Sequence, residues 1–464
     1  MLLDRIQRVY FLGIGGIGMS SLARFFRSRG IAVAGYDRTQ TPLTLALESE
    51  GINIHYEDNP EQVPFAIQKH PSEPETLIIY TPAIPKDMLE LNYFIDNGYL
   101  LHKRSEILGL ITRNYDSLAV AGTHGKSTVT AMIAQILIES GEGCTAFLGA
   151  ISKSINSNLV LSDLSRWAVV EADEFDRSFL QLDPFMACIT SMDPDHLDIY
   201  GDYETLVIGF TDFVNRVKPQ SKLLIKQGLH LQPDSARKQK VLTYSLDSVD
   251  SDYYARNIRQ VELGYSFDLV TPDGTVKDLL TRIPGITNVE NAVAAAALTQ
   301  MAGISEDGIR KGIEAFAGLV RRFDVRFNKG GVVYIDDYAH HPNEINALIR
   351  SIRLLFPDRK ITGIFQPHLY SRTRDFAGGF AESLGKLDEL ILLDLYPARE
   401  KPIPGVDSKM IFDRVELNAK QLCAKGDLIK TLESYQPEIL LTIGAGDIDQ
   451  LCDPIIKYLE EHVA

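Results

Sequence analysis

The feature that most constrains this chain is a short glycine loop between an apolar run and a helical segment. Residues 118–120 read Leu-Ala-Val, and residues 122–127 read Gly-Thr-His-Gly-Lys-Ser. Backbone N–H groups of such a loop can wrap phosphates, the Lys126 ammonium can neutralise the β and γ charge, and the Ser127 hydroxyl can bind Mg²⁺. The pattern predicts a nucleoside triphosphate site at the start of a helix reaching residue 139. The loop is shorter than the full P-loop pattern, which has glycine where this chain has Val120.

A second glycine loop lies near the N-terminus. Residues 13–18 read Gly-Ile-Gly-Gly-Ile-Gly after the apolar run 9–12, and a predicted strand over 31–36 ends at Asp37. This is the dinucleotide-binding fingerprint, which alone fits a nicotinamide or flavin cofactor, another diphosphate, or only a tight turn. Because a triphosphate loop follows later in the chain, we expect ATP and a nucleotide-linked substrate instead of a redox cofactor.

Composition narrows the class of protein. The chain has 464 residues, which is enough for about three domains. Its net charge is −15 and it has no dense basic run, which argues against nucleic-acid binding. The four cysteines lack metal-binding spacing and are expected to be buried thiols in a reducing compartment. With no apolar run long enough to span a bilayer and no signal-peptide pattern, we expect a cytoplasmic protein without a membrane partner, as a monomer or homodimer.

Strand and helix patterns alternate along the chain and predict an α/β protein of three domains. The expected boundaries are 1–105, 106–318 and 319–464, with a hairpin insertion suggested by Pro-Asp-Gly at 272–274. Alternation of this kind is typical of mostly parallel, doubly wound sheets. Strands are expected near 8–12, 31–36, 76–80, 118–120, 144–148, 167–171, 187–190, 222–225, 332–335, 361–365, 389–395 and 438–443.

Two acidic clusters follow predicted strands of the middle domain. One holds four acids within 171–176, and the other reads Asp-Pro-Asp-His-Leu-Asp over 193–198. Because carboxyl ends of parallel strands share one edge of a sheet, both clusters can converge on the loop at 122–127. Carboxylate, hydroxyl and phosphate oxygens are the ligands that Mg²⁺ prefers, so we predict a magnesium site; solvated acidic loops are the alternative.

Further polar side chains lie where ligand contacts are expected. Asn288 and Asn291 begin an Ala-rich helix, where Asn288 could be an N-cap and Asn291 could contact a nucleobase. Arg321 and Arg322 adjoin the predicted boundary at 318, where one could stabilise charge on a transferring phosphoryl group. The segments 336–342 and 366–374 follow buried strands of the third domain and could line a site. Zinc at the paired histidines of 340–341 is disfavoured, since no cysteine or third histidine has metal spacing.

Taken together, these motifs resemble the Mur ligases of peptidoglycan synthesis, in particular the branch that joins L-alanine to UDP-N-acetylmuramate. The resemblance spans nearly the whole chain in order. Its motifs are GIGGIGMS at 13–20, AGTHGKST at 121–128, EADEFDRSFL at 171–180, DPDHLDIYG at 193–201, RRF at 321–323, DDYAHHP at 336–342 and GAGDI at 444–448.

The resemblance implies a Rossmann-like first domain for the UDP-sugar, a central P-loop domain for ATP and a Rossmann-like third domain that closes on ATP and the amino acid. The UDP-sugar contacts it implies are Gly15, Gly16, Ile17, Gly18, Asp37, Thr81 and Ser105. The ATP contacts are Gly122, Thr123, His124, Gly125, Lys126, Ser127, Thr128, Asn288, Asn291, Arg322 and Asp337. Magnesium would be held by Ser127, Glu174 and His196, and the amino acid by Tyr338, His341, His368, Arg372 and Arg374. The catalytic set it implies is Lys126, Glu174, His196, Arg322 and His341.

The chain departs from the family pattern at several positions: Thr287 replaces a common histidine before the adenine motif, Phe175 a frequent serine, and Leu369 and Arg399 a common arginine and glycine. Residues 200–215 contain no lysine, which fits the alanine-adding branch because several related ligases carry a carbamylated lysine there. Three alternatives stay open: a ligase that recycles a tripeptide onto the same sugar, a nicotinamide-dependent oxidoreductase, and a non-catalytic nucleotide-binding regulator.

Overall fold

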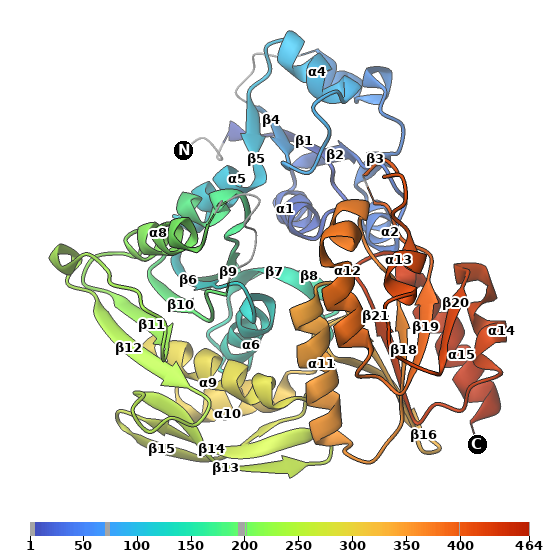
Figure 1. Ribbon diagram of the computed structural model, residues 1–464. Helices are drawn as coiled ribbons and strands as arrows, with labels where there is room; N and C mark the ends of the chain where they lie inside the picture. Colours follow the sequence, from blue (N-terminus) through green and yellow to red (C-terminus); the bar gives the residue numbers. More distant parts are fainter. Residues whose placement is uncertain (1–4, 70–74, 194–199, 201, 399, 464) are drawn as a thin grey trace. The chain divides into compact units, whose positions relative to one another are not determined.

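The computed structural model describes residues 5–69, 75–193, 200, 202–398 and 400–463. Figure 1 shows alternating strands and helices arranged as three sheets, which confirms the α/β class. Internal contacts divide the chain into two compact units. The first comprises Met1–Ile283 and Thr287–Ala317, and the second comprises Pro284–Ile286 and Gly318–Ala464. The first unit carries two of the sheets, so the expected boundary near residue 105 stays a prediction.

The first sheet is parallel throughout, as the dinucleotide fingerprint predicts. Its strands, in spatial order, are β3 (Asn53–His55), β2 (Ala32–Tyr36), β1 (Arg8–Leu12), β4 (Thr76–Tyr80) and β5 (Leu101–Lys103). Its helices are α1 (Ile17–Ser28), α2 (Pro42–Ser49), α3 (Phe65–Gln68), α4 (Leu89–Asp96) and α5 (Arg104–Thr112). Both faces of β1 are buried: Tyr10 and Leu12 pack in one apolar cluster, Val9 and Phe11 in another. This explains why the strand is a continuous apolar run.

The second sheet is mixed but mostly parallel, and the triphosphate loop follows one of its central strands. The strands, in spatial order, are β15 (Gly274–Thr281), β14 (Gly264–Thr271), β13 (Tyr253–Val261), β12 (Lys240–Ser245), β11 (Lys222–Lys226), β10 (Met186–Ile189), β6 (Asp116–Ala121), β9 (Trp167–Ala172), β7 (Thr145–Ser152) and β8 (Ser157–Val160). The accompanying helices are α6 (Lys126–Glu139), α8 (Tyr203–Val214), α9 (Ile286–Met301) and α10 (Glu306–Ala315), with a 3₁₀ segment, η3 (Phe175–Gln181). The hairpin suggested by Pro-Asp-Gly is confirmed, because β14 and β15 pair antiparallel around residues 272–273.

The third sheet forms the core of the second unit and has one antiparallel edge strand. Its order is β16 (Asp324–Lys329), β17 (Val332–Asp337), β21 (Ile439–Ile443), β18 (Ile361–Phe365), β19 (Glu389–Leu393) and β20 (Lys420–Cys423). The helices are α11 (Pro342–Leu355), α12 (Tyr370–Leu384), α13 (Ser408–Phe412), α14 (Leu428–Leu432) and α15 (Cys452–His462). Apolar clusters pack on both faces of this sheet. The remaining strand pairs are parallel, as expected for a doubly wound domain.

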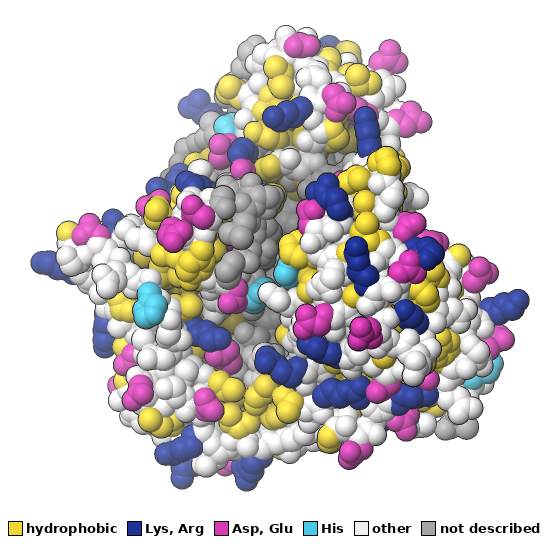
Figure 2. All heavy atoms as spheres, viewed as in Figure 1, with side chains coloured by type: hydrophobic (Ala, Val, Ile, Leu, Met, Phe, Trp, Pro, Cys, Tyr) yellow, Lys and Arg dark blue, Asp and Glu magenta, His cyan; other side chains and the backbone are white. Residues whose placement is uncertain are grey.

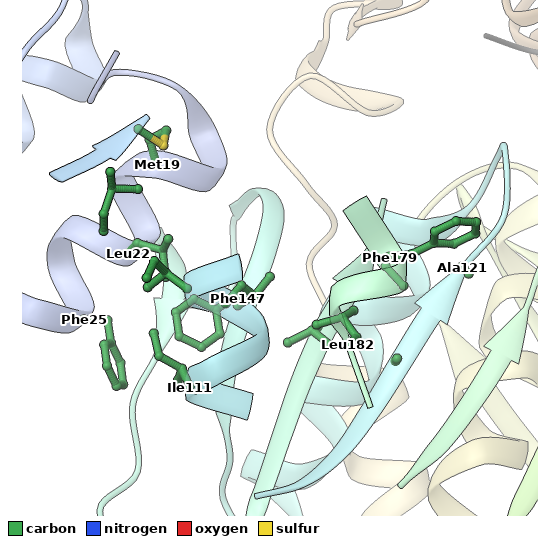
Figure 3. Packing of buried hydrophobic residues seen from close by; sticks show 14 of the residues in the cluster. Met19, Leu22, Phe25, Ile111, Ala121, Phe147, Phe179 and Leu182 are labelled. Carbon is green, nitrogen blue, oxygen red and sulfur yellow. The ribbon is translucent and has the colours of Figure 1, made fainter. Parts of the chain in front are cut away.

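One apolar cluster joins the first two sheets within the first unit. Figure 3 shows Leu22 and Phe25 of α1, Ile111 of α5 and Phe147 of β7 gathered in this cluster. A buried polar contact crosses the same interface, because the Asn158 side chain of β8 donates to the Ile17 carbonyl (2.6 Å) and to Ser20 Oγ (2.9 Å) of α1. The start of α1 is therefore fixed against the central sheet.

The distribution of charged side chains and the burial of the cysteines agree with what the composition predicts. Figure 2 shows acidic and basic side chains interspersed over the visible face. All four cysteines, Cys144, Cys188, Cys423 and Cys452, are buried free thiols, as expected. Within the part of the chain that the structure describes, none of the helices has the length and apolar character needed to cross a membrane.

Candidate active site

The triphosphate loop adopts a backbone shape that requires glycine at two positions. Gly122 has φ 141° and Gly125 has φ 83°, and α6 begins directly afterwards at Lys126. A Cβ on Gly122 would lie 2.2 Å from Thr190 Oγ1, so only glycine fits against the neighbouring strand end. The free N–H groups at the start of α6 therefore point out of a compact turn at the carboxyl edge of β6, where a phosphate can bind.

Side chains that follow β10 hold this loop in place. Thr190 Oγ1 donates to the carbonyls of Ala121 (3.1 Å) and His124 (2.5 Å). Ser191 Oγ accepts from the His124 N–H at 2.7 Å and lies 3.0 Å from Thr123 Oγ1. Thr123 in turn accepts from the N–H of Asp193 at 3.0 Å. The segment after β10 thus pre-forms the loop before any phosphate arrives.

Lys126 is paired with Glu174, which lies in the segment after β9. Its ammonium donates to Glu174 Oε2 (2.7 Å) and Oε1 (2.9 Å) and to the Gly122 carbonyl (2.6 Å). Burial alone would lower the pKa of Lys126, but the charges of Glu174, Glu171 and Asp173 outweigh it and raise the pKa. Lys126 therefore stays charged, and the acidic cluster at 171–176 converges on the loop as predicted.

The described part of the predicted magnesium site has a suitable donor set. Ser127 is half-buried in the first turn of α6, and Glu174 is fully buried beside the same loop. A hydroxyl and a carboxylate are hard oxygen donors, which fit Mg²⁺ together with phosphate oxygens. His196, the third predicted ligand, lies outside the described residues. Among the residues that are described, no group of three His, Cys, Asp or Glu side chains is placed to hold a metal ion.

The two asparagines of α9 lie beside the loop. The helix begins at Ile286, so Asn288 lies inside its first turn, and the N-cap alternative is wrong. Asn291 Nδ2 donates to Asn288 Oδ1 at 3.0 Å. A Cβ on Gly125 would lie 3.0 Å from Asn291 Oδ1, which places this amide against the triphosphate loop. Thr128 follows in the first turn of α6.

In the first sheet, the acid of the fingerprint holds the glycine loop itself. Asp37 Oδ2 accepts a hydrogen bond from the Gly15 N–H at 2.7 Å. A Cβ on Gly15 would lie 2.8 Å from the same oxygen, so the close approach requires glycine. Gly16 is the N-cap of α1 and has extended backbone, with Ile17 as the first helical residue. Asp37 therefore shapes the glycine loop through this hydrogen bond.

A cavity of about 300 Å³ joins this loop to the acidic cluster. On one side it is lined by Gly16, Ile17 and Gly18 of the α1 start and by Thr81. On the other side it meets Glu171 and Asp173, which precede Glu174. Ser105, also predicted as a sugar contact, is buried in the first turn of α5. The first glycine loop and the acidic segment thus share one cavity within the first unit.

In the second unit, the adjacent arginines have different surroundings. Arg321 donates to the carbonyls of Gly444 (2.5 Å) and Gly446 (3.1 Å) and lies 3.2 Å from Asp449. It therefore ties the start of this unit to the loop after β21. The guanidinium carbons of both arginines lie near the Tyr338 ring, that of Arg321 at 5.0 Å and that of Arg322 at 5.2 Å from its centre. Of the two, Arg322 is the one that the structure leaves as a candidate for phosphate.

Asp337 ends β17 and holds two backbone N–H groups. It accepts from Phe323 N (2.7 Å) and Ala339 N (2.8 Å). Burial raises the pKa of Asp337 to about 6, although the Arg322 charge and these hydrogen bonds oppose the rise. Phe323 has φ 45°, a left-handed conformation that this hydrogen bond stabilises.

Three histidines of the second unit, His340, His341 and His368, make contacts that stabilise the local structure. His341 caps α11, since its Nδ1 accepts from Asn343 N at 3.3 Å, and Glu344 completes a capping box. The His340 and His368 rings lie 6.4 Å apart, and His368 stacks on Tyr396. These histidines are not arranged as a zinc site in the described structure.

The two predicted arginines of α12, Arg372 and Arg374, have different partners. Arg372 Nη1 lies 3.3 Å from His368 Nδ1 and so joins the histidine cluster. Arg374 is exposed and pairs with Asp375, its own neighbour, with Nε 2.7 Å from Oδ1. The structure therefore brings Tyr338, His368 and Arg372 to the carboxyl edge of the third sheet, whereas the Arg374 side chain is exposed and paired with Asp375.

Sequence reasoning missed the residues that support the site. Thr190 and Ser191 hold the triphosphate loop, and Asn158 holds the start of α1. The position of Thr190 and Ser191 directly after a buried strand is a signal that could have found them. For Asn158 the sequence offers no such signal, because its contact depends on how the first two sheets pack.

Comparisons with known proteins place this arrangement in a family. Three family models match the chain in order: the Mur ligase family catalytic domain over residues 8–116, the Mur ligase middle domain over 120–299 and the Mur ligase glutamate ligase domain over 321–448. The UDP-N-acetylmuramate–L-alanine ligase of Parabacteroides distasonis is 48% identical over 457 residues, covering 98% of each chain. That of Flavobacterium psychrophilum is 47% identical over 461 residues, covering 99% of this chain and 100% of the relative.

Solved structures of Mur ligases have the same fold as this chain. The UDP-N-acetylmuramate–alanine ligase of Thermotoga maritima has a TM-score of 0.82 and 26% identity, covering 98% of this chain and 99% of that one. A murein peptide ligase of Psychrobacter arcticus, at 21% identity and a TM-score of 0.70, shares the fold. With three domain models matched in order and near-full-length relatives above 40% identity, the chain belongs to the Mur ligase family.

Proposed function

We propose that this protein is an ATP-dependent ligase that joins L-alanine to the carboxylate of UDP-N-acetylmuramate during cytoplasmic synthesis of peptidoglycan precursors. The observation that carries the proposal is the cavity shared by the first glycine loop and the acidic segment that leads to Glu174. A sugar nucleotide bound at the α1 start would place its acid next to the segment that pairs with the P-loop lysine.

The chemistry proceeds in two steps. A lactyl carboxylate oxygen attacks the γ-phosphorus of ATP, the bond to the bridging oxygen breaks, and ADP leaves an acyl phosphate on the sugar. The amine of L-alanine then attacks the acyl carbon, the C–O bond to phosphate breaks, and an amide and inorganic phosphate form as the nitrogen loses its proton. Both steps depend on positioning the reactants and on stabilising charge at the phosphoryl group.

Lys126 and Arg322 would neutralise this charge. The Lys126 ammonium would leave Glu174 and the Gly122 carbonyl to contact the β and γ phosphates. Ser127 and Glu174 would hold Mg²⁺, with His196 as the further ligand that the family resemblance implies. A bound Mg²⁺ would supply positive charge that offsets the negative charge developing on the phosphoryl group. Asn288, Asn291 and Asp337 would contact the remainder of ATP.

The second unit would recognise the amino acid. Tyr338, His341, His368 and Arg372 would surround L-alanine, with the Arg372 guanidinium as a partner for its carboxylate. Arg374 would contact the amino acid by exchanging Asp375 for the substrate carboxylate.

A phosphate-release assay tests the proposal. Purified protein with ATP, Mg²⁺ and UDP-N-acetylmuramate should release phosphate when L-alanine is added. The matched arms replace L-alanine with another amino acid, with the cell-wall tripeptide, or with buffer. Phosphate release with the tripeptide in place of L-alanine would identify the recycling ligase instead. No release with any acceptor, together with NADH binding, would support the oxidoreductase alternative.

A further inference from the structure

Two adjacent basic residues at the start of α5 pair with the acids on either side of Glu174. Lys103 Nζ lies 2.8 Å from Asp176 Oδ2, and Arg104 Nη2 lies 3.6 Å from Asp173 Oδ2. The first sheet thus contacts the acidic segment on both sides of the residue that pairs with Lys126. Neither basic residue is among the site residues predicted from the sequence.

The two pairs differ in strength and in what surrounds them. The Lys103 pair has the distance of a direct hydrogen bond, whereas the Arg104 pair is longer than one. Arg104 also lines the cavity, and Lys103 does not. A Cβ on Gly18 would lie 2.5 Å from Arg104 Nη1, so the guanidinium packs against the first turn of α1.

The segment that these pairs hold is conformationally strained. Asp176 and Arg177 have φ 53° and 52°, a left-handed conformation that non-glycine residues seldom adopt. Asp173 also accepts a hydrogen bond from Phe175 N at 3.1 Å, and Glu174 between them is fully buried. The strained backbone of this segment is maintained by its contacts with neighbouring residues. A change of partner at Asp173 can therefore change the conformation of the segment around Glu174.

We propose that Arg104 exchanges Asp173 for an anionic group of the sugar nucleotide, and that this exchange couples the sugar-nucleotide site to the Mg²⁺–ATP site. This inference rests on the proposed function. An anion entering the cavity at the α1 start meets a guanidinium whose present partner is held only loosely. Once released, Asp173 adds an uncompensated negative charge beside Glu174, which favours a divalent cation at the P-loop.

The exchange predicts opposite effects for its two partners. Arg104→Met removes the cation and should weaken UDP-N-acetylmuramate binding about ten- to a hundredfold, the effect of losing a charge-assisted hydrogen bond. Asp173→Asn removes the competing anion and should tighten binding of the same ligand, while leaving Arg104 in place. A purely structural role for the pair predicts weaker binding in both variants.

Coupling is measured by calorimetry on the full chain. In the wild type, saturating UDP-N-acetylmuramate should lower the Kd of ADP in Mg²⁺ about fivefold or more, and the reverse titration should give the same factor. Both variants should lose this factor. Lys103→Met is the matched control, because it breaks the neighbouring pair outside the cavity and should keep the sugar-nucleotide affinity within about twofold.

The outcomes are separable. Wild-type affinity in Arg104→Met, weaker binding in Asp173→Asn, or an unchanged coupling factor in both would overturn the exchange. Failure of the wild type to bind UDP-N-acetylmuramate or to release phosphate would instead overturn the proposed function. Circular dichroism of each variant identifies any that fails to fold, and the remaining partner variant then decides.

Discussion

Lys126 and Glu174 form a buried ion pair, with the lysine Nζ 2.7 Å from one carboxylate oxygen and 2.9 Å from the other. The Glu174 side chain is 1% exposed and that of Lys126 12% exposed, so neither charge is solvated by bulk water. Each charge requires the other in this state, since an unpaired buried charge is costly. Nucleotide binding must therefore provide a new partner for Lys126 in the phosphates and one for Glu174 in a cation.

Lys126→Met should abolish ATP turnover and leave sugar-nucleotide binding in place. Removing one preorganised donor that stabilises transition-state charge costs about 100- to 1000-fold in kcat. The measurement pairs phosphate release with calorimetric binding of UDP-N-acetylmuramate. Lys218→Met, which removes an exposed lysine of the same unit, is the control and should keep wild-type rates. Activity of Lys126→Met within tenfold of wild type would refute the assigned role.

Thr190→Val should raise the KM for ATP about three- to thirtyfold with little effect on the KM for the sugar nucleotide. The substitution keeps the shape of the side chain but removes the hydroxyl that donates to Ala121 and His124 carbonyls. The loop then loses about one hydrogen bond of preorganisation, and a buried carbonyl is left unsatisfied. Thr190→Ser retains the hydroxyl and should behave as wild type. Equal effects of valine and serine would show that packing, not the hydroxyl, holds the loop.

Gly149→Ala should destabilise the first unit by about 1–3 kcal/mol, the usual cost of overpacking. Gly149 lies in β7, and a Cβ there would lie 1.9 Å from Glu171 Oε2. Chemical denaturation followed by fluorescence measures the change. Gly378→Ala in α12 is the matched control, because its Cβ would meet nothing within 4 Å. It should be neutral or slightly stabilising. A stable Gly149→Ala protein would mean that the Glu171 carboxylate moves aside freely.

The stability of the second unit should depend on pH through Asp337. Burial raises the pKa of its carboxyl from 3.8 to about 6, so the folded state binds the proton more tightly than the unfolded chain. The free energy of unfolding contributed by this group therefore falls as pH rises from about 4 to 6. Denaturation midpoints across this range measure the slope, and Asp337→Asn should flatten it. An Asp337→Asn slope equal to that of wild type would assign the effect to other groups.

Much of the fold could be predicted because its central strands are long apolar runs. β1, β6, β17 and β21 are buried on both faces, which gives the continuous pattern that the sequence shows. The edge strands β3, β5 and β8 have three or four residues each, too few for a periodic signal. They form because a neighbouring strand offers hydrogen-bonding partners.

The candidate site was predictable where a residue type has one clear chemical use. The Gly-Lys-Ser loop and the acids after β9 could be read in this way, and the structure brings Lys126 and Glu174 together. The contacts of Asn158, Arg104 and Thr190 could not be read, because each depends on elements that only the folded chain brings side by side. Asp37 differs from these residues, because the sequence motif identifies it but its hydrogen bond to Gly15 supports the glycine loop itself.

Positional isotope exchange tests the central claim, the acyl phosphate, most directly. ATP carrying ¹⁸O in the β–γ bridge is incubated with the protein, Mg²⁺ and UDP-N-acetylmuramate, without L-alanine. Reversible transfer to the sugar carboxylate lets the β-phosphate of ADP rotate, so the label should scramble into non-bridging positions in wild type and not in Lys126→Met. An enzyme that turns over with L-alanine but leaves the bridge label in place would contradict the account.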